Sequence, residues 1–266
     1  MFKKFLIIIC LITVLFTLAG VNASDVNDTV VACEDQNEVT LTENQDNDEL
    51  STAEDNKLSA NTGTLPNLAD EIKKSDGELN LTRDYAYTSR IGERVTDIPY
   101  LDGIPVNKKI TINGNGFTID GKNKASAFFI LKTTNPIVLN NITFKNCYSP
   151  SIGGAIYSEA KNIVITNCRF IDNSAKDNGA AIYIFGEDST ISNCTFTNNK
   201  AKNGGALHIK CHTTLSNCIF TNNKADDGGA AIIGGQSLVL NCSFTDNAAN
   251  RAGAIWTQCH NTTIIN

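Results

Sequence analysis

The chain has 266 residues, 41% of them hydrophobic, and a formal net charge of −6. A negative chain lacks the basic surface that nucleic-acid binding needs, so we expect no nucleic-acid partner. The hydrophobic content is too high for a chain that is disordered throughout. The charge is unevenly spread, at +2 over residues 1–23, −12 over residues 24–78 and +4 over residues 79–266, which divides the chain into three segments.

Residues 1–23 are predicted to be a secretory signal peptide. Lys3 and Lys4 precede an apolar run, Phe5–Leu18, and small residues follow at the end of the segment. A basic start, an apolar centre and a small-residue cleavage site are typical of such peptides. The apolar run is shorter than the ~20 residues that span a bilayer, which argues against the alternative of an uncleaved anchor. We therefore expect cleavage after Ala23, no transmembrane segment in the mature chain, and a secreted or cell-surface protein.

Residues 24–78 have the composition of an acidic spacer. They contain fifteen acidic residues against three lysines, and no aromatic residue. Such a segment cannot bury enough apolar area to offset the loss of backbone entropy on folding, and its like charges favour an extended chain. We predict a disordered spacer over residues 24–78. Residues 79–107 precede the repeats described below. We predict that they form an N-terminal cap that covers the unpaired strand edges at the start of the repeat array.

Residues 108–266 contain an internal repeat. Phenylalanine recurs at intervals of 24 to 26 residues, with an asparagine three positions before it. The phenylalanines are Phe144, Phe170, Phe196, Phe220 and Phe244. The asparagines are Asn141, Asn167, Asn193, Asn217 and Asn241. Positions that keep register over five copies predict a tandem array of one supersecondary unit.

Alternating segments such as Ile163–Ile165 and Cys168–Phe170 predict several short strands in each repeat. Three short strands per ~25 residues indicate an all-β fold, a right-handed parallel β-helix in which one repeat forms one coil. Coils stack ~4.8 Å apart, so equivalent residues form columns. We predict that the Phe column fills the bore. We place the Asn column at a turn, where Asn tolerates left-handed backbone angles and can form a hydrogen-bonded ladder.

Cysteine occupies a further column from the second copy onward, at Cys168, Cys194, Cys218 and Cys242. Parallel side chains in one column are badly placed for disulfide bonds, so we predict free buried thiols. The chain ends on Asn266, 25 residues after Asn241 and at the Asn position of another copy. We therefore expect a truncated product or a fragment of a longer array.

Two motifs resemble those of known surface proteins. Gly-Gly-Ala-Ile at residues 153–156, with Phe-x-x-Asn as at residues 196–199, resembles the repeat of chlamydial polymorphic outer-membrane proteins. The pattern of residues 110–121, followed by Asn-Ile-Thr-Phe at residues 141–144, resembles adhesin-like surface proteins of methanogenic archaea. The resemblance covers residues 79–266 and implies a secreted or wall-associated β-helix that contacts other cells or surfaces.

Groups with catalytic or metal-binding potential are scattered. β-Helices also serve as polysaccharide lyases and hydrolases, but a glycosidase needs two carboxyls ~5–10 Å apart. The acidic residues here are mostly scattered among turns, and Asp172 and Asp246, which share an offset, lie three coils or ~14 Å apart. Cys211–His212 and Cys259–His260 resemble metal-ligand pairs, yet they lie two coils, ~10 Å, apart. We therefore predict no catalytic residue, no metal site and no cofactor, with a carbohydrate-active enzyme as the alternative.

An outward column is the strongest candidate for a binding face. The residue after each inward aliphatic of the Gly-Ala motif should point outward, and these residues are Tyr157, Tyr183, His208, Ile233 and Trp256. Rings with polar tips suit sugar faces or protein partners, although the same rings can also stack on one another and stiffen the sheet. We predict an adhesin-like protein that binds cell-surface glycans or proteins through Tyr157, Tyr183, His208 and Trp256. The remaining alternative is a structural spacer that binds nothing.

Overall fold

The computed structural model describes residues 61–88, 98–210, 212–258 and 261–265. The predicted signal peptide and residues 24–60 of the predicted spacer lie outside the described residues. Within the described ranges, no helix is both long enough and apolar enough to cross a membrane.

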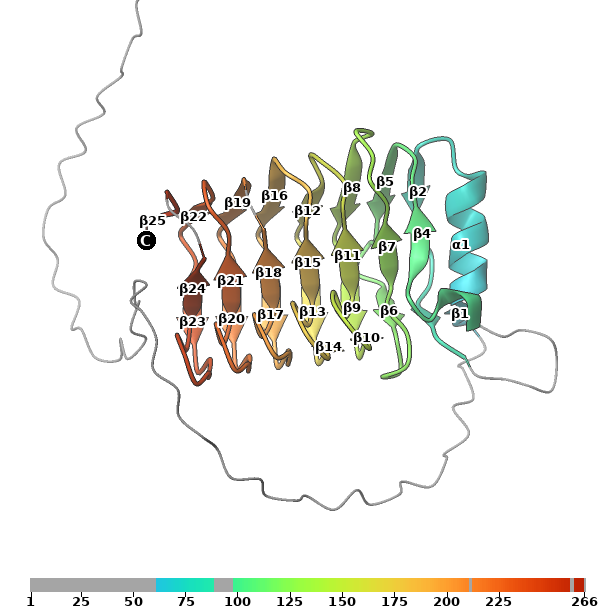
Figure 1. The fold of residues 1–266 in the computed structure, drawn as a ribbon. Helices are drawn as coiled ribbons and strands as arrows, with labels where there is room; N and C mark the ends of the chain where they lie inside the picture. Colours follow the sequence, from blue (N-terminus) through green and yellow to red (C-terminus); the bar gives the residue numbers. More distant parts are fainter. Residues whose placement is uncertain (1–60, 89–97, 211, 259–260, 266) are drawn as a thin grey trace, which may run out of the picture.

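The strands form three parallel sheets along the axis of a solenoid (Figure 1). Sheet A consists of β1 (Gly63–Thr64), β3 (Tyr85–Ala86), β6 (Thr118–Asp120), β9 (Thr143–Lys145), β13 (Arg169–Ile171), β17 (Thr195–Thr197), β20 (Ile219–Thr221) and β23 (Ser243–Thr245). Sheet B consists of β2 (Glu78–Asn80), β5 (Ile110–Asn113), β8 (Ile137–Asn140), β12 (Val164–Thr166), β16 (Ser189–Ser192), β19 (Thr213–Ser216), β22 (Leu238–Leu240) and β25 (Thr263–Ile265). Sheet C consists of β4 (Ile104–Val106), β7 (Phe128–Ile130), β11 (Ile156–Ser158), β15 (Ile182–Ile184), β18 (Leu207–Ile209), β21 (Ala231–Ile233) and β24 (Ile255–Thr257).

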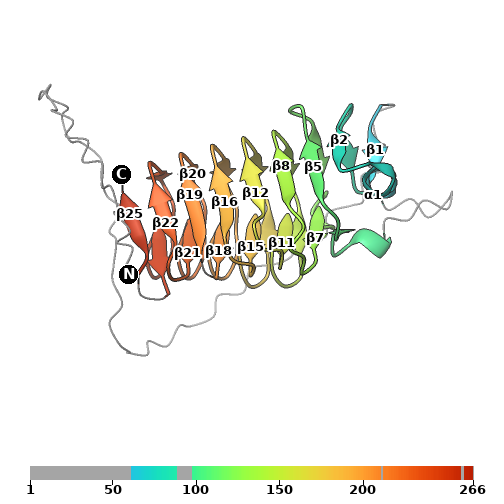
Figure 2. The ribbon, with the colours of Figure 1, turned by 90° about the horizontal axis from the view of Figure 1, so that it is seen from above.

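Each coil passes through sheet B, then sheet A, then sheet C before the chain moves to the next coil (Figure 2). The strands β5, β6 and β7 make one such coil, and each pairs in parallel with its equivalent in the next coil. A short extra pair, β10 (Tyr148–Ser149) with β14 (Ser174–Ala175), lies between sheets A and C. The predicted fold is confirmed: the chain is a parallel β-solenoid of about 8 turns with ~25 residues per coil.

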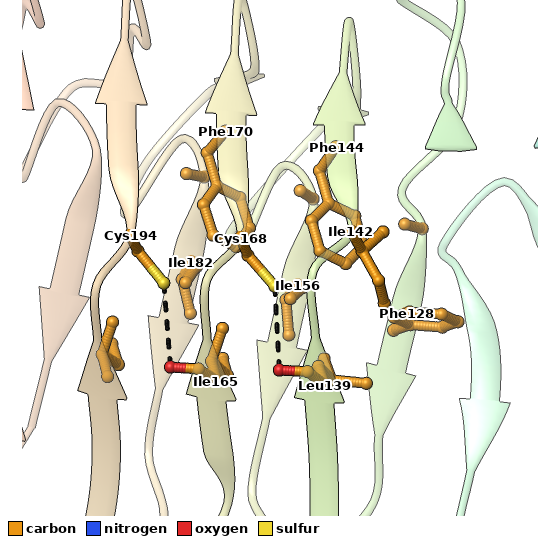
Figure 3. Close-up of a cluster of buried hydrophobic side chains, with 14 of the residues drawn as sticks. Phe128, Leu139, Ile142, Phe144, Ile156, Ile165, Cys168, Phe170, Ile182 and Cys194 are labelled. Atoms are coloured by element: carbon orange, nitrogen blue, oxygen red, sulfur yellow. Dashed lines mark hydrogen bonds between the residues drawn. The ribbon is translucent and has the colours of Figure 1, made fainter. Parts of the chain in front are cut away.

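The five predicted phenylalanines form one stack in the bore. Neighbouring ring centroids lie 4.6–4.9 Å apart with ring planes within 9° of parallel. Phe128 ends the stack by meeting Phe144 edge-on at 5.8 Å (Figure 3). This spacing is that of adjacent strands in a sheet, so the stack follows directly from one phenylalanine per coil.

The predicted cysteine column lies beside the Phe column, and its thiols are free and buried. Each sulfur points at a backbone carbonyl of the preceding coil, as Cys168 Sγ does to Leu139 O and Cys194 Sγ to Ile165 O, both at 3.7 Å (Figure 3). Cys147, another free thiol, is completely buried, and burial raises its pKa to about 12. A thiol that stays protonated acts as a small apolar residue of the core.

The spacer boundary predicted at residue 78 is wrong, because helix α1 (Leu65–Lys74) covers the end of the bore (Figure 1). Leu65, Leu68 and Ile72 recur at helical spacing and are at most 4% exposed. Thr64 begins the helix with a capping box. The prediction was made from the average composition of residues 24–78, which is acidic, and this short amphipathic pattern was therefore overlooked.

The described part of residues 79–107 belongs to the first coil and not to the predicted cap, since β3 and β4 lie within it and β2 joins sheet B at its start. Helix α1 forms the cap, and the Glu71 carboxylate of the helix is hydrogen-bonded to this coil. Arg83 donates to Glu71 Oε1 at 2.7 Å, and the hydroxyl of Tyr85 donates to Glu71 Oε2 at 2.5 Å. Burial, followed by the hydrogen bond to Glu71, raises the pKa of Tyr85 to about 12.

The predicted Asn column at the turn has the expected backbone but not the expected ladder. Its five residues have φ between 48° and 56°. Among the described residues one hydrogen bond joins two of them, from Asn241 Nδ2 to Asn217 Oδ1 at 3.4 Å. These five side chains are exposed, and Asn167 donates outside the column, to Asn140 Oδ1 at 2.8 Å.

The continuous ladder lies in the bore, on the asparagines three positions after each phenylalanine: Asn173, Asn199, Asn223 and Asn247. The carboxamides of the first three donate to the Oδ1 of the next coil at 2.9–3.0 Å, and all four donate to the backbone carbonyl of a phenylalanine at 2.9–3.1 Å. A buried carboxamide must find protein partners, which is why the ladder forms here.

The copy at residues 228–233 is shifted by one residue from the prediction. Leu207 pairs with Ala231, and His208 pairs with Ile232. Ala231 therefore points into the bore, and Ile232 replaces Ile233 in the outward column. The prediction aligned the large aliphatic Ile232 with Leu207. In the structure each residue of this copy pairs with the residue 24 positions before it, so Ala231 is the partner of Leu207.

Candidate binding face on the outer side of sheet C

The predicted aromatic residues lie in one column on the outer side of sheet C, which we call the ring column. Its members are Phe129, Tyr157, Tyr183, His208, Ile232 and Trp256. Each is the central residue of a three-residue strand whose outer two residues point into the bore. Strand pairing thus brings together all four residues predicted for the binding face.

The faces of these rings are turned toward one another. Tyr157 stacks on Phe129 at 5.1 Å and on Tyr183 at 5.8 Å, with ring planes within 13° of parallel. Tyr183 contacts the His208 ring at 5.1 Å. Tyr183 is 7% exposed and His208 3%. The column is therefore not the exposed face that the sequence predicts, because a sugar needs an open ring face and these faces are covered.

Trp256, at the far end of the ring column, is covered by a cation. The guanidinium of Arg251 lies 4.2 Å from the Trp256 ring. The same guanidinium makes two hydrogen bonds to Asp227, at 2.6 and 2.7 Å. The only tryptophan of the chain thus takes part in an intramolecular contact between two coils.

A second row follows the ring column at the end of each strand, and we call it the rim row. It consists of Asn107, Leu131, Glu159, Phe185, Lys210, Gly234 and Gln258. Phe185 is 58% exposed and Leu131 36% exposed. Among the described residues, no ring or cation lies against Phe185. The rim row is therefore the part of this face that presents apolar side chains to the solvent.

Sequence reasoning missed Phe185, although a signal was present. Tyr183 and Phe185 are separated by one residue, and period-two alternation puts both side chains on the outer face. The run Ile182–Phe185 has no polar residue, so it reads equally well as core. Only the strand boundaries decide that Phe185 lies beyond the sheet and is open to solvent.

Groups of opposite charge lie on either side of Phe185 in the rim row. Glu159, on the coil before it, accepts a hydrogen bond from the Tyr157 hydroxyl at 2.5 Å. Burial, followed by this hydrogen bond, raises the pKa of Tyr157. Lys210, on the coil after it, places its ammonium 5.8 Å from the Tyr183 ring. The neighbourhood of Phe185 therefore carries one negative and one positive charge.

His208 lies behind this neighbourhood and stays neutral. Burial, followed by repulsion from Lys210, lowers the pKa of His208 to about 4. At the adjoining corner, Lys161 donates to Glu187 at 2.6 Å, and this hydrogen bond lowers the pKa of Glu187. His212 Nδ1 lies 3.7 Å from Asp188. The charged groups near the rim row are held in place by neighbouring side chains.

Two acidic residues elsewhere in the repeats are hydrogen-bonded to asparagines of the next coil. Asp120 accepts from Asn146 at 3.2 Å, and Asp172 accepts from Asn198 at 3.1 Å. Within the described residues, no group of three or more His, Cys, Asp or Glu side chains could hold a metal ion. Cys211, Cys259 and His260, three members of the Cys-His pairs in the sequence, lie outside the described residues.

Comparison with known proteins identifies the fold family. The family model described as "Right handed beta helix region" matches residues 100–266. The chain belongs to the right-handed β-helix family. No curated protein and no solved structure matches this β-helix chain, so its resemblance to archaeal adhesin-like and chlamydial surface proteins stays a prediction. The β-helix fold occurs in binding proteins and in enzymes, and the function has to be argued from the site.

Proposed function

We propose that this β-helix protein is an adhesin-like, secreted or cell-surface protein that binds glycans without transforming them. The binding face is the rim row on the outer side of sheet C, centred on Phe185. The observation that carries the proposal is a phenylalanine that is 58% exposed, directly after strand β15, with no ring against it among the described residues. An open aromatic ring beside hydrogen-bonding groups suits the apolar face of a sugar.

The polar groups around Phe185 support a glycan as the ligand. Glu159 and Lys210 stand on the two neighbouring coils and can accept and donate hydrogen bonds to hydroxyl groups. Each directly follows a strand of sheet C, and its backbone N–H donates a hydrogen bond to a carbonyl of the preceding coil. A preorganised pair of hydrogen-bonding groups beside an open ring fixes the orientation of a bound sugar.

The pairing of the acidic groups supports binding without catalysis. Asp120, Asp172 and Asp227 each hold a partner on an adjacent coil. Glu187 is engaged by Lys161. A hydrolase needs one carboxylic acid and one free carboxylate facing each other across a bond, and neighbouring partners here occupy these groups instead.

A binding experiment with matched variants tests the proposal. The full chain and its Phe185→Ala and Ile219→Ala variants are applied to a glycan array and to whole cells. Ile219 is the control because it is also an exposed apolar residue, at 50%, but lies on sheet A. We expect Phe185→Ala to lose at least about tenfold in affinity, the worth of one buried phenyl ring, and Ile219→Ala to bind as the parent does.

Two results would overturn the proposal. Binding that is the same for Phe185→Ala and for the parent chain would remove Phe185 from the site. Release of shortened products from any bound glycan, measured by chromatography, would replace binding with the enzymatic alternative.

A further inference from the structure

The rim row alternates between polar and apolar residues from coil to coil. In order along the axis the residues are Asn107, Leu131, Glu159, Phe185 and Lys210. Adjacent coils are 4.6–4.9 Å apart, as the Phe stack in the bore shows. The two apolar members, Leu131 and Phe185, are therefore two coils or ~10 Å apart, with Glu159 between them.

We infer that the rim row binds a linear, uncharged β-1,4-linked polysaccharide that lies parallel to the solenoid axis. This inference rests on the proposed function and names its ligand. In a fully extended β-1,4-linked chain, successive sugars are turned by half a turn, so equivalent faces recur once per disaccharide. That repeat is close to the ~10 Å that separates Leu131 from Phe185. Apolar sugar faces can then meet Leu131 and Phe185 while hydroxyl groups meet the polar residues between them.

The charges of the row select an uncharged chain. Glu159 and Lys210 carry opposite charges on the two sides of Phe185. A polyanionic glycan would be repelled at Glu159, and a polycationic one at Lys210. A neutral chain meets neither repulsion and can use both groups as hydrogen-bond partners.

The length of the row sets the number of sugars. Gly234 follows Lys210 in the row, and a β-carbon at this position would lie 1.7 Å from the carbonyl oxygen of Lys210. A side chain is therefore excluded at this coil, and the row of contacts ends at Lys210. Asn107 to Lys210 spans four coil spacings, ~19 Å, which is the length of about four sugars in an extended β-1,4-linked chain.

The test is a titration of the full chain by calorimetry with cello-oligosaccharides and fully N-acetylated chito-oligosaccharides, both uncharged, from the dimer to the hexamer. Maltohexaose, an α-1,4-linked chain that coils instead of extending, is the matched control ligand. We expect affinity to rise with length up to about four sugars and then level off, since the row offers no further contacts. We expect the β-1,4-linked hexamers to bind at least about tenfold more tightly than maltohexaose.

Protein variants locate the chain on the row. Phe185→Ala and Leu131→Ala should each weaken binding of the β-1,4-linked hexamers, by about tenfold and about threefold respectively, because the phenyl ring buries more area. Ile219→Ala should bind as the parent does. Circular dichroism and thermal unfolding of each variant verify that the fold is intact.

The outcomes distinguish the inference from the proposed function. Phe185-dependent binding of glycans with no preference for β-1,4 linkage, or with no effect of Leu131→Ala, would overturn the axial arrangement and leave the proposed function in place. Absence of any Phe185-dependent binding on the glycan array would overturn both.

Discussion

Phe170 and Phe185 belong to the same coil, and the β-helix uses their rings in opposite ways. Phe170 lies in the bore between two parallel rings, each 4.9 Å away, and is 0% exposed. Phe185 lies on the outer face of sheet C and is 58% exposed. The contrast teaches that a solenoid column stabilises the fold when its members contact one another, and is available to a ligand when they do not.

The largest expected effect tests the bore side of this comparison. Phe170→Ala removes a fully buried ring from the middle of the Phe stack and leaves a cavity between Phe144 and Phe196. Such substitutions cost about 3–5 kcal/mol in free energy of unfolding. Urea denaturation followed by circular dichroism measures the loss. A cost below about 1 kcal/mol would show that the stack is not tightly packed.

The next prediction compares two asparagines in the same way. Asn199 lies in the buried ladder, and Asn199→Ala would remove the side-chain partners of the Asn173 backbone N–H and of the Phe170 carbonyl. Each buried polar group that loses its hydrogen-bond partner costs about 1–3 kcal/mol, so we expect a loss of about 3 kcal/mol in free energy of unfolding.

Asn193, at the exposed turn, is the control for Asn199. Its φ is 54°, which an alanine adopts at a cost of about 1 kcal/mol and a glycine at almost none. Urea denaturation of Asn193→Ala and Asn193→Gly should therefore give losses of about 1 and about 0 kcal/mol. Equal losses for Asn199→Ala and Asn193→Ala would contradict the assignment of the ladder to the bore.

A third prediction concerns His208, which lies on the outer face but is buried like a bore residue. Its pKa is lowered to about 4 in the folded chain, by burial and by Lys210, from 6.5 in the unfolded chain. Because the pKa of His208 is lower in the folded chain than in the unfolded chain, this histidine stabilises the folded chain fully above pH 6.5. That stabilisation is lost as the pH falls toward 4. Between pH 7.5 and pH 5 we expect a loss of about 2 kcal/mol from this group.

The His208→Phe variant is the control for that pH dependence. A phenylalanine keeps a ring against Tyr183 and cannot take up a proton. Urea denaturation of both proteins at the two pH values should show a smaller loss for the variant, by about 2 kcal/mol. The same pH dependence in both proteins would mean that the acid sensitivity arises elsewhere.

The repeat made the bore predictable, because identical side chains one coil apart must superpose when strands pair in parallel. The Phe stack and the free thiols followed from spacing alone. Helix α1 was hidden because Leu65, Leu68 and Ile72 lie in a segment whose average composition is acidic. The Asn column at the turn was predicted correctly, but the hydrogen-bonded ladder was placed on it and lies instead on the buried asparagines, since spacing shows that a column exists but not whether its side chains face water or the bore.

The outer face was less predictable for a related reason. Spacing identified the ring column correctly, but exposure depends on what covers each ring. Tyr183 is covered by Tyr157 and His208, and Phe185, two residues later, has no such neighbour among the described residues. Sequence periodicity assigns both to the same face and cannot separate a stacked ring from an open one.

The smallest expected effect tests the outer side of the comparison. Phe185→Ala removes a ring of the same size as Phe170→Ala does, but from a position that is 58% exposed. Since most of its area is already in contact with water, we expect a change within about 0.5 kcal/mol in free energy of unfolding. Urea denaturation beside Phe170→Ala makes the comparison direct. A loss above about 2 kcal/mol would show that Phe185 packs against the fold, and its exposed ring could then no longer be explained by a ligand.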